Sequence, residues 1–197
     1  MPTAKKNDFI TVEEYLNGEL ISEVKHEYVD GQVFAMAGAT PDHGRISSNI
    51  NRILGNHLID NPCEPFISDM KVKTSISKYR YPDVLVICDD NFIENGNVTE
   101  TPTIIVEVLS KSTRKTDERD KLLEYINLPT LKEYVIVEQY CADVTVYRRS
   151  EKWFPKHYFL GENIHFESID LTLSVEEIYH RVKNEDMIDF LKNQNKQ

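Results

Sequence analysis

The sequence has few cysteines and no long apolar run. Its three cysteines, Cys63, Cys88 and Cys141, stand far apart in 197 residues and show no CxxC spacing, so neither a disulfide framework nor a zinc site is expected. No stretch approaches the roughly 20 apolar residues of a membrane-spanning helix, and the first ten residues lack the apolar segment of a signal peptide. We therefore expect a cytoplasmic protein in a reducing compartment, without membrane association.

Basic residues are also in the minority. The chain has 23 Lys and Arg against 33 Asp and Glu, a net charge of −10, which argues against a protein that coats nucleic acid non-specifically. The segments 71–80 and 111–121 nevertheless hold nine of these basic residues, so a polyanionic substrate is less favoured but stays open. The length and the 40% hydrophobic content favour one domain, which we place at 9–182 between short tails at 1–8 and 183–197.

Cap and turn signals divide the chain into helices and strands. Thr11 with Glu14 predicts a capped helix that ends at Gly18, and Asp30-Gly31 between apolar runs predicts a hairpin over 25–37. Apolar spacing predicts a helix over about 42–60, with His43 on its apolar stripe. The remaining expectations are strands at 65–74, 81–88, 103–110, 133–139, 143–148 and within 152–166, a helix at 116–128 with Leu122, Leu123 and Ile126 inward, and a helix capped by Ser174.

Two carboxylates interrupt strands that are otherwise apolar. Glu107 lies within Thr103–Leu109, and Asp83 follows Pro82 at the start of the preceding strand. Burying an unpaired carboxylate costs several kcal/mol or forces its protonation. The 23 residues between the two allow the strands to be neighbours, and two convergent carboxylates favour a hard divalent cation, Mg²⁺ or Mn²⁺, which can activate water and stabilise phosphoryl charge.

Each carboxylate taken alone has a simpler interpretation. Asp83 after Pro82 is ordinary turn chemistry at a strand entrance. Glu107 alone is equally well explained as a buried ion pair with a Lys or Arg. Both together, in strands that can be adjacent, favour a site.

The order and spacing of several short motifs resemble a known family. Pro82-Asp83 followed by Val106-Glu107-Val108-Leu109-Ser110 resembles the PD-(D/E)xK nuclease superfamily, and the chain from Phe9 to about Val182 resembles its Uma-two branch of restriction-endonuclease-like proteins. The further matching pieces are Lys25–Gly31, Ala35–Gly38, His43, Tyr81–Val84, Asp120-Lys121 with Tyr125, and Glu133-Tyr134.

The resemblance implies an α/β (α+β) fold with a restriction-endonuclease-like core, in which helices flank a mixed central sheet. It implies hydrolysis of DNA phosphodiesters with Mg²⁺ or Mn²⁺ and no organic cofactor. Asp83, Glu107 and the Val108 carbonyl would hold the metal, and Glu27 and His43 would join the site. The alternative interpretation of Glu27 is a solvated residue on a strand face, and that of His43 is a partly buried core histidine.

One position departs from the superfamily pattern. The pattern places a Lys two residues after the acidic strand residue, and this chain has Leu109 there. We expect Lys121 to replace that lysine, because Asp117, Lys121 and Tyr125 recur at intervals of four and share one helix face. The alternatives are a plain Asp117–Lys121 surface pair, or the loop residues Lys111 and Lys115 in the same role.

The leading hypothesis is therefore a metal-dependent DNA endonuclease. A homodimer is expected, since two sites related by a two-fold axis cut both strands most simply. One rival is a nuclease-fold protein that has lost catalysis and serves as a nucleic-acid or protein interaction module. The other is a metal-free hydrolase that uses Asp83 and Glu107 as an acid/base pair.

Overall fold

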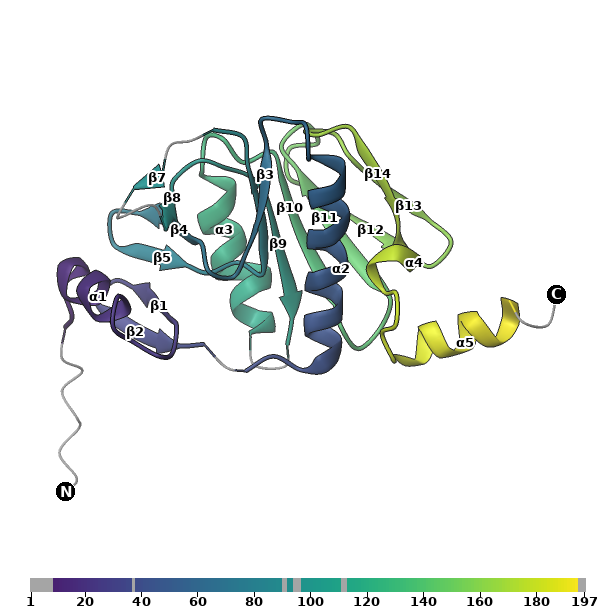
Figure 1. Cartoon of the computed structure of the whole chain (residues 1–197), viewed down its shortest axis with the longest axis horizontal. Helices are drawn as coiled ribbons and strands as arrows, with labels where there is room; N and C mark the ends of the chain where they lie inside the picture. The colour runs from purple at the N-terminus through teal and green to yellow at the C-terminus, as the bar shows by residue number, and fades with distance from the viewer. Residues whose placement is uncertain (1–8, 37, 90–91, 94–96, 111–112, 195–197) are drawn as a thin grey trace, which may run out of the picture.

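The computed structural model describes residues 9–36, 38–89, 92–93, 97–110 and 113–194. Figure 1 shows an N-terminal lobe on one side, a central sheet in the middle, and a C-terminal helix that projects from the opposite side. Within the described ranges, no helix is long and apolar enough to cross a membrane.

The N-terminal lobe follows its cap and turn signals. Thr11 caps helix α1 (Val12–Glu19) through a capping box with Glu14, as predicted, and the helix ends one residue after Gly18. Strands β1 (His26–Val29) and β2 (Gln32–Ala35) pair in antiparallel fashion, which confirms the hairpin. Asp30 and Gly31 turn the chain with φ of 48° and 88°, the left-handed conformation that a two-residue hairpin loop requires.

The first sheet extends this hairpin in the order β2-β1-β5-β4-β8-β7. Tyr15 of α1 stacks on Tyr28 of β1 with ring centroids 4.9 Å apart, and both pack against Tyr79 in a small aromatic core. The added strands are β4 (Lys71–Ser75), β5 (Lys78–Arg80), β7 (Phe92–Ile93) and β8 (Val98–Thr99).

The central sheet has the order β12-β11-β10-β9-β6-β3. Strands β9 and β10 are parallel, whereas the other neighbours are antiparallel. This arrangement confirms the predicted mixed sheet and the predicted adjacency of the strands that follow Asp83 and contain Glu107. Its strands are β3 (Glu64–Ile67), β6 (Val84–Ile87), β9 (Pro102–Leu109), β10 (Glu133–Glu138), β11 (Asp143–Arg148) and β12 (Pro155–Phe159).

Helices cover both faces of the central sheet (Figure 1). Helix α2 (Pro41–His57) buries Ile46, Ile50 and Leu54 against one face. That core also includes residues of β13 (Asn163–Phe166), β14 (Leu171–Ser174) and α4 (Val175–Ile178), which has the predicted capping box of Ser174 and Glu177. The other face packs against the π-helical turn η2 (Thr116–Lys121) and helix α3 (Leu122–Ile126). Helix α5 (Glu185–Gln194) is the projecting C-terminal helix.

Three details of the predicted elements are wrong. The run 65–74 is divided between β3 and β4, which belong to different sheets, and residues 152–166 supply two strands rather than one. The third error concerns the helix at 116–128. Leu123 is 61% exposed and Tyr125 is fully buried, because the first turn is π-helical and brings Lys121 and Tyr125 inward. Leu122 packs against the core, as predicted.

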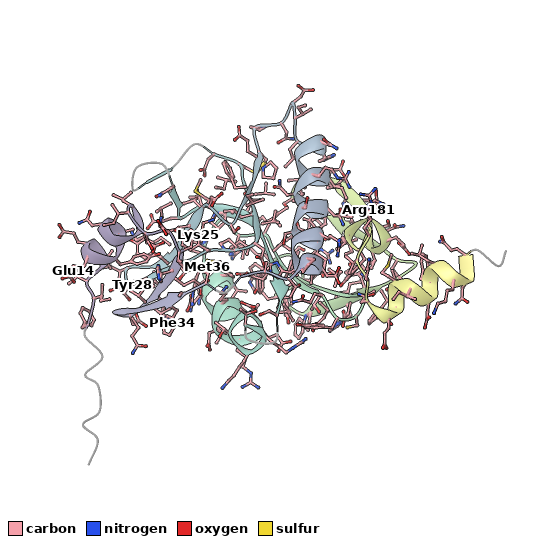
Figure 2. All side chains as sticks on the ribbon, turned by 60° about the horizontal axis from the view of Figure 1, so that its bottom comes forward. Glu14, Lys25, Tyr28, Phe34, Met36 and Arg181 are labelled. Atoms are coloured by element: carbon pink, nitrogen blue, oxygen red, sulfur yellow. A yellow bond between two sulfur atoms is a disulfide. The ribbon has the colours of Figure 1, made fainter. Side chains whose placement is uncertain are left out.

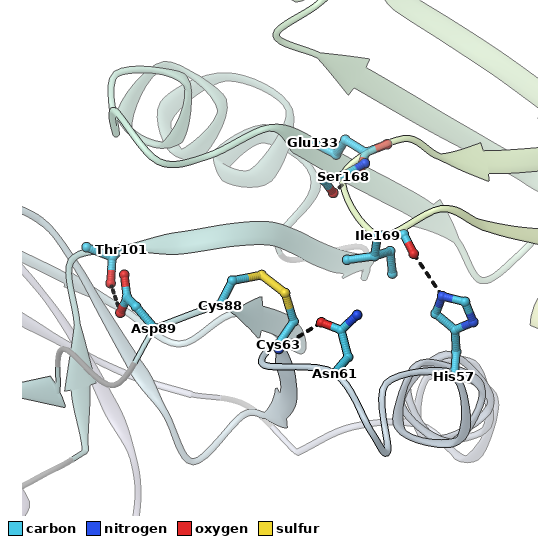
Figure 3. The surroundings of a disulfide bond; sticks show 9 residues. All are labelled: His57, Asn61, Cys63, Cys88, Asp89, Thr101, Glu133, Ser168 and Ile169. Carbon is cyan, nitrogen blue, oxygen red and sulfur yellow. Dashed lines mark hydrogen bonds between the residues drawn. A yellow bond between two sulfur atoms is a disulfide. The ribbon is translucent and has the colours of Figure 1, made fainter.

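The expectation about cysteines is also wrong, because Cys63 and Cys88 form a disulfide (Figure 3). Glu64 of β3 pairs with Ile87 of β6 in antiparallel register, so the residues just outside that pair face each other. Cys63 and Cys88 are 25 residues apart in the sequence, and no sequence motif predicts that they are in contact. Cys141 is a free, exposed cysteine.

Candidate active site

Glu107 lies in the middle of the site. It occupies the apolar strand β9 and is only 3% exposed. Its Oε1 atom accepts hydrogen bonds from the Lys121 ammonium at 3.0 Å and from the Tyr125 hydroxyl at 2.9 Å. Both donors come from the segment η2–α3, so the buried ion pair with a lysine, the simpler interpretation of Glu107 taken alone, is present.

Asp83 lies beside Glu107, immediately before β6. Its Oδ2 atom accepts a hydrogen bond of 2.7 Å from the backbone N–H of Val108. In the β6–β9 ladder Val84 is opposite Val106, so Asp83, in the bend just before β6, lies at the end of that ladder, next to residues 107–108 of β9. The turn before β6 therefore holds one carboxylate against the strand that carries the other.

Lys121 is the cation of the site. Its Nζ atom lies 2.9 Å from Glu27, 3.0 Å from Glu107 and 3.1 Å from Asp117. The side chain is only 6% exposed, so the interpretation as a plain surface pair is wrong. The contact with Asp117 lies within ion-pair distance, although the same carboxylate oxygen makes no well-directed hydrogen bond. The contact between Lys121 and Asp117 is therefore electrostatic.

Burial and repulsion shift the pKa values of these groups. Burial raises the pKa of Glu107 well above its usual value; Lys121 opposes the shift, while Asp117, Asp83 and Glu27 reinforce it. Burial likewise raises the pKa of Asp117 against the effect of Lys121. Burial lowers the pKa of Lys121, but the surrounding carboxylates outweigh it and raise that pKa well above the usual value. Lys121 therefore stays charged at neutral pH.

Glu27 joins the site from the first sheet, as the resemblance implied. Burial raises its pKa, but Lys121 and Arg80 outweigh this effect and lower the pKa below the usual value. Arg80 donates a 2.8 Å hydrogen bond to Glu27 and two further bonds, of 2.8 and 2.7 Å, to Glu124 of α3. Lys121 and Arg80 together connect the first sheet, α3 and the central sheet.

His43, in helix α2, contacts Asp83. Thr40 caps α2 and accepts a hydrogen bond from the His43 backbone N–H, and the ring Nε2 lies 3.3 Å from Asp83 Oδ2. Burial lowers the pKa of His43, but hydrogen bonding to Asp83 and to the Val108 backbone outweighs it and raises the pKa above the usual value. His43 therefore contacts the predicted metal ligands directly, unlike an ordinary core histidine.

The buried side chain of Gln139 fastens the helix that carries His43 to β9. Its amide donates a 2.6 Å hydrogen bond to the Leu109 carbonyl, and its oxygen accepts one of 2.5 Å from the hydroxyl of Thr40. The N-terminus of α2 is thereby tied to the strand that carries Glu107.

The structure brings together Asp83, Glu107, Val108, Lys121, Glu27 and His43. Asp69, a further acidic residue between β3 and β4, pairs with Lys25 at the surface and lies outside the site. Lys115 is exposed at the start of η2, and Lys111 lies outside the described residues. Sequence reasoning missed Arg80, Glu124 and Gln139. The position of Arg80, directly before Tyr81-Pro82-Asp83, could have indicated that it belongs to the site. No feature of the sequence marks Glu124 or Gln139 as site residues.

The described residues contain no group of three or more His, Cys, Asp or Glu side chains that is arranged to hold a metal ion. The donor chemistry at Asp83 and Glu107 nevertheless fits a hard divalent cation. Carboxylates and carbonyls are the ligands that Mg²⁺ and Mn²⁺ prefer, and Asp83 is among the groups whose charge raises the pKa of Glu107. A cation relieves repulsion of this kind.

Comparisons with known proteins identify a family for this chain. The Uma2 family, described as "Putative restriction endonuclease", matches residues 12–176. Two uncharacterized proteins of Synechocystis sp. are similar to this chain. The first, slr1290, is 33% identical over 173 residues, covering 86% of this chain and 91% of its own. The second, sll1609, is 34% identical over 163 residues, covering 80% and 92%.

A crystal structure from Anabaena variabilis, described as a putative nuclease belonging to DUF820, has the same fold. It superposes with a TM-score of 0.69 at 17% identity and covers 83% of this chain and 96% of its own. The fold, the order of the motifs and the match over most of the length lead to one conclusion: the chain belongs to the Uma2 family of restriction-endonuclease-like proteins.

Proposed function

We propose that this protein is a divalent-metal-dependent endonuclease that hydrolyses DNA phosphodiester bonds. The observation that carries the proposal is the hydrogen bond from the Val108 N–H to Asp83, which holds one carboxylate beside the buried carboxylate of Glu107. The nuclease description of the family and of the Anabaena structure supports the same reaction class.

Asp83, Glu107 and the carbonyl of Val108 would hold the metal. A bound Mg²⁺ or Mn²⁺ supplies a Lewis acid that makes water a better nucleophile and stabilises charge on a phosphoryl oxygen. His43 orients Asp83, since its ring contacts both that carboxylate and the Val108 backbone.

Lys121 would place a positive charge next to the scissile phosphate. Glu27 and Asp117 hold its ammonium in position, and the raised pKa of Lys121 keeps it protonated. A preorganised cation in a site shielded from water stabilises charge that develops in the transition state. The Lys121 ammonium beside Glu107 favours an active nuclease over a catalytically silent interaction module. It supplies the positive charge that is missing at position 109, where this chain has a leucine instead of the expected lysine.

DNA is the proposed substrate, and a homodimer is the proposed assembly for double-strand cleavage. The net charge of −10 implies contact with DNA over a limited surface, because phosphate neutralisation by Lys and Arg dominates non-specific affinity.

Calorimetric titration with Mn²⁺ tests the metal site directly. We expect saturable binding to the wild type and none to Asp83→Asn/Glu107→Gln, because that double variant loses both anionic ligands. Asp69→Asn, which removes an exposed carboxylate outside the site, should bind Mn²⁺ like the wild type. Equal Mn²⁺ affinity in the wild type and the double variant would exclude metal binding at Asp83 and Glu107.

A further inference from the structure

An exposed phenylalanine lies next to the candidate site. Phe34 belongs to β2, the terminal strand of the first sheet, and is 49% exposed. Its direct partner in the antiparallel pair with β1 is Glu27, the residue whose carboxylate lies 2.9 Å from the Lys121 ammonium. Figure 2 labels Phe34 and Tyr28 on this hairpin.

The hairpin register places Phe34 on the site's side of the sheet. Directly opposed residues of an antiparallel pair project from the same face, and successive residues alternate between faces. Tyr28 and its partner Val33 pack into the aromatic core with α1. Glu27 and Phe34 therefore project from the opposite face, toward Lys121, with side-chain origins about 5 Å apart.

The surroundings of Phe34 suit a nucleobase better than a phosphate. The residue opposite Phe34 is Glu27, whose carboxylate is already paired with Lys121 and Arg80. Gln32, two residues before Phe34 on the same face, is exposed and neutral. A phosphate finds its cation at Lys121, beside Glu27, and the uncharged ring of Phe34 offers it no ionic contact. An uncharged base offers a flat π-face, which an aromatic ring accepts whatever the base sequence.

We propose that Phe34 stacks on a base next to the scissile phosphate and that the β1–β2 hairpin is a substrate-contacting element. This inference rests on the proposed function and narrows its substrate class. Bases within a duplex are covered by their neighbours on both faces, so stacking requires an unpaired or displaced base. The preferred substrate is accordingly DNA with an unpaired nucleotide beside the cleaved bond.

The test is DNA binding in Ca²⁺, with the oligonucleotide shown by gel electrophoresis to stay intact. Fluorescence anisotropy with a single-stranded oligonucleotide should show about 5- to 150-fold weaker binding for Phe34→Ala, the range of one base–aromatic stack. Phe34→Trp should restore the affinity, and its added tryptophan emission should be quenched by DNA. Phe159→Ala is the matched control, since Phe159 is 51% exposed on β12 of the other sheet, and it should bind like the wild type.

Wild-type affinity in Phe34→Ala, an equal loss in Phe159→Ala, or no DNA binding by the wild type would each overturn the inference. The two proposals fail separately. If the wild type cleaves DNA in Mg²⁺ and Phe34→Ala binds and cleaves equally well, base stacking is wrong and the nuclease stands. If Phe34→Ala alone weakens binding but no DNA is cleaved in Mg²⁺ or Mn²⁺, stacking stands and the nuclease is wrong.

Discussion

The ammonium of Lys121 lies 3.0 Å from the carboxylate of Glu107, although the two residues belong to different elements. In the superfamily pattern the lysine sits two residues after the acid on the same strand, about 6.6 Å along it. Here that position is Leu109, which is buried in the apolar cluster beneath α3. The π-helical turn η2 places the Lys121 ammonium beside Glu107 from the helix, and we propose that it replaces the strand lysine.

Replacing Lys121 should impair turnover more than metal affinity. We expect Lys121→Met to lower kcat by about 10²–10³-fold, the usual cost of losing one preorganised electrostatic contact. Mn²⁺ affinity by calorimetry should change little. Lys115→Met, at an exposed position at the start of η2, should leave kcat unchanged. Wild-type kcat in Lys121→Met would remove the lysine from the mechanism.

Neutralising Glu107 should stabilise the metal-free fold. Burial and neighbouring carboxylates raise its pKa, whereas glutamine keeps an oxygen for the Lys121 and Tyr125 hydrogen bonds. Glu107→Gln in EDTA at neutral pH should raise Tm by about 2–4 °C, equivalent to about 1 kcal/mol in a chain of this size. Glu138→Gln, in the neighbouring strand and paired with Arg114, should not raise Tm.

The gain should depend on pH in a defined direction. Because the folded pKa of Glu107 lies above its ordinary value of 4.5, folding favours the protonated form and the charged form carries a penalty. The penalty is absent below about pH 4.5, grows as the pH rises toward the folded pKa, and is complete above it. A gain in Glu107→Gln that is larger at acidic pH than at neutral pH contradicts this account.

Removing Arg80 should destabilise the fold strongly. Arg80 is 5% exposed and pairs with Glu27 and Glu124, so Arg80→Met leaves two largely buried carboxylates without their partner, at a cost of about 3–5 kcal/mol. Urea unfolding measures this loss. Arg114→Met removes a 41% exposed arginine from its ion pair with Glu138 and should lower the free energy of unfolding by at most about 1 kcal/mol. Similar losses in the two variants would mean that Arg80 is not a buried connector.

The Cys63–Cys88 disulfide should contribute measurable stability. It closes a loop across 25 residues, for which the chain-entropy relation gives about 3–4 kcal/mol. Dithiothreitol should lower the Tm of the wild type and leave Cys63→Ser/Cys88→Ser unaffected. Alkylation of the unfolded, unreduced protein should modify Cys141 alone, and modification of all three cysteines would show that the bond is absent.

Local signals predicted local structure well. Thr11 with Glu14 and Ser174 with Glu177 formed their capping boxes, and Asp30-Gly31 made its hairpin turn, because each depends on a few adjacent residues. The carboxylates at 83 and 107 stood out since they conflict with an apolar strand, and their strands pair as expected.

Features that depend on distant contacts were not predictable in the same way. The division of residues 65–74 between two sheets depends on which strands pair, and the disulfide depends on the β3–β6 register. The π-helical turn buries Lys121 and exposes Leu123, the opposite of what their hydrophobicity predicts. The buried position of Lys121 is stabilised by ion pairs with three carboxylates. Hydrophobic periodicity carries no information about such a charge cluster.

DNA cleavage tests the central claim most directly. Supercoiled plasmid and single-stranded circular DNA would be incubated with wild type, Asp83→Asn and Phe159→Ala in Mg²⁺, Mn²⁺ or EDTA. We predict cleavage by wild type and Phe159→Ala with either metal, none in EDTA, and at least about 10²-fold slower cleavage by Asp83→Asn. Equal cleavage by Asp83→Asn and wild type, or no cleavage of either DNA under any metal and salt condition, would contradict the assignment as a metal-dependent endonuclease.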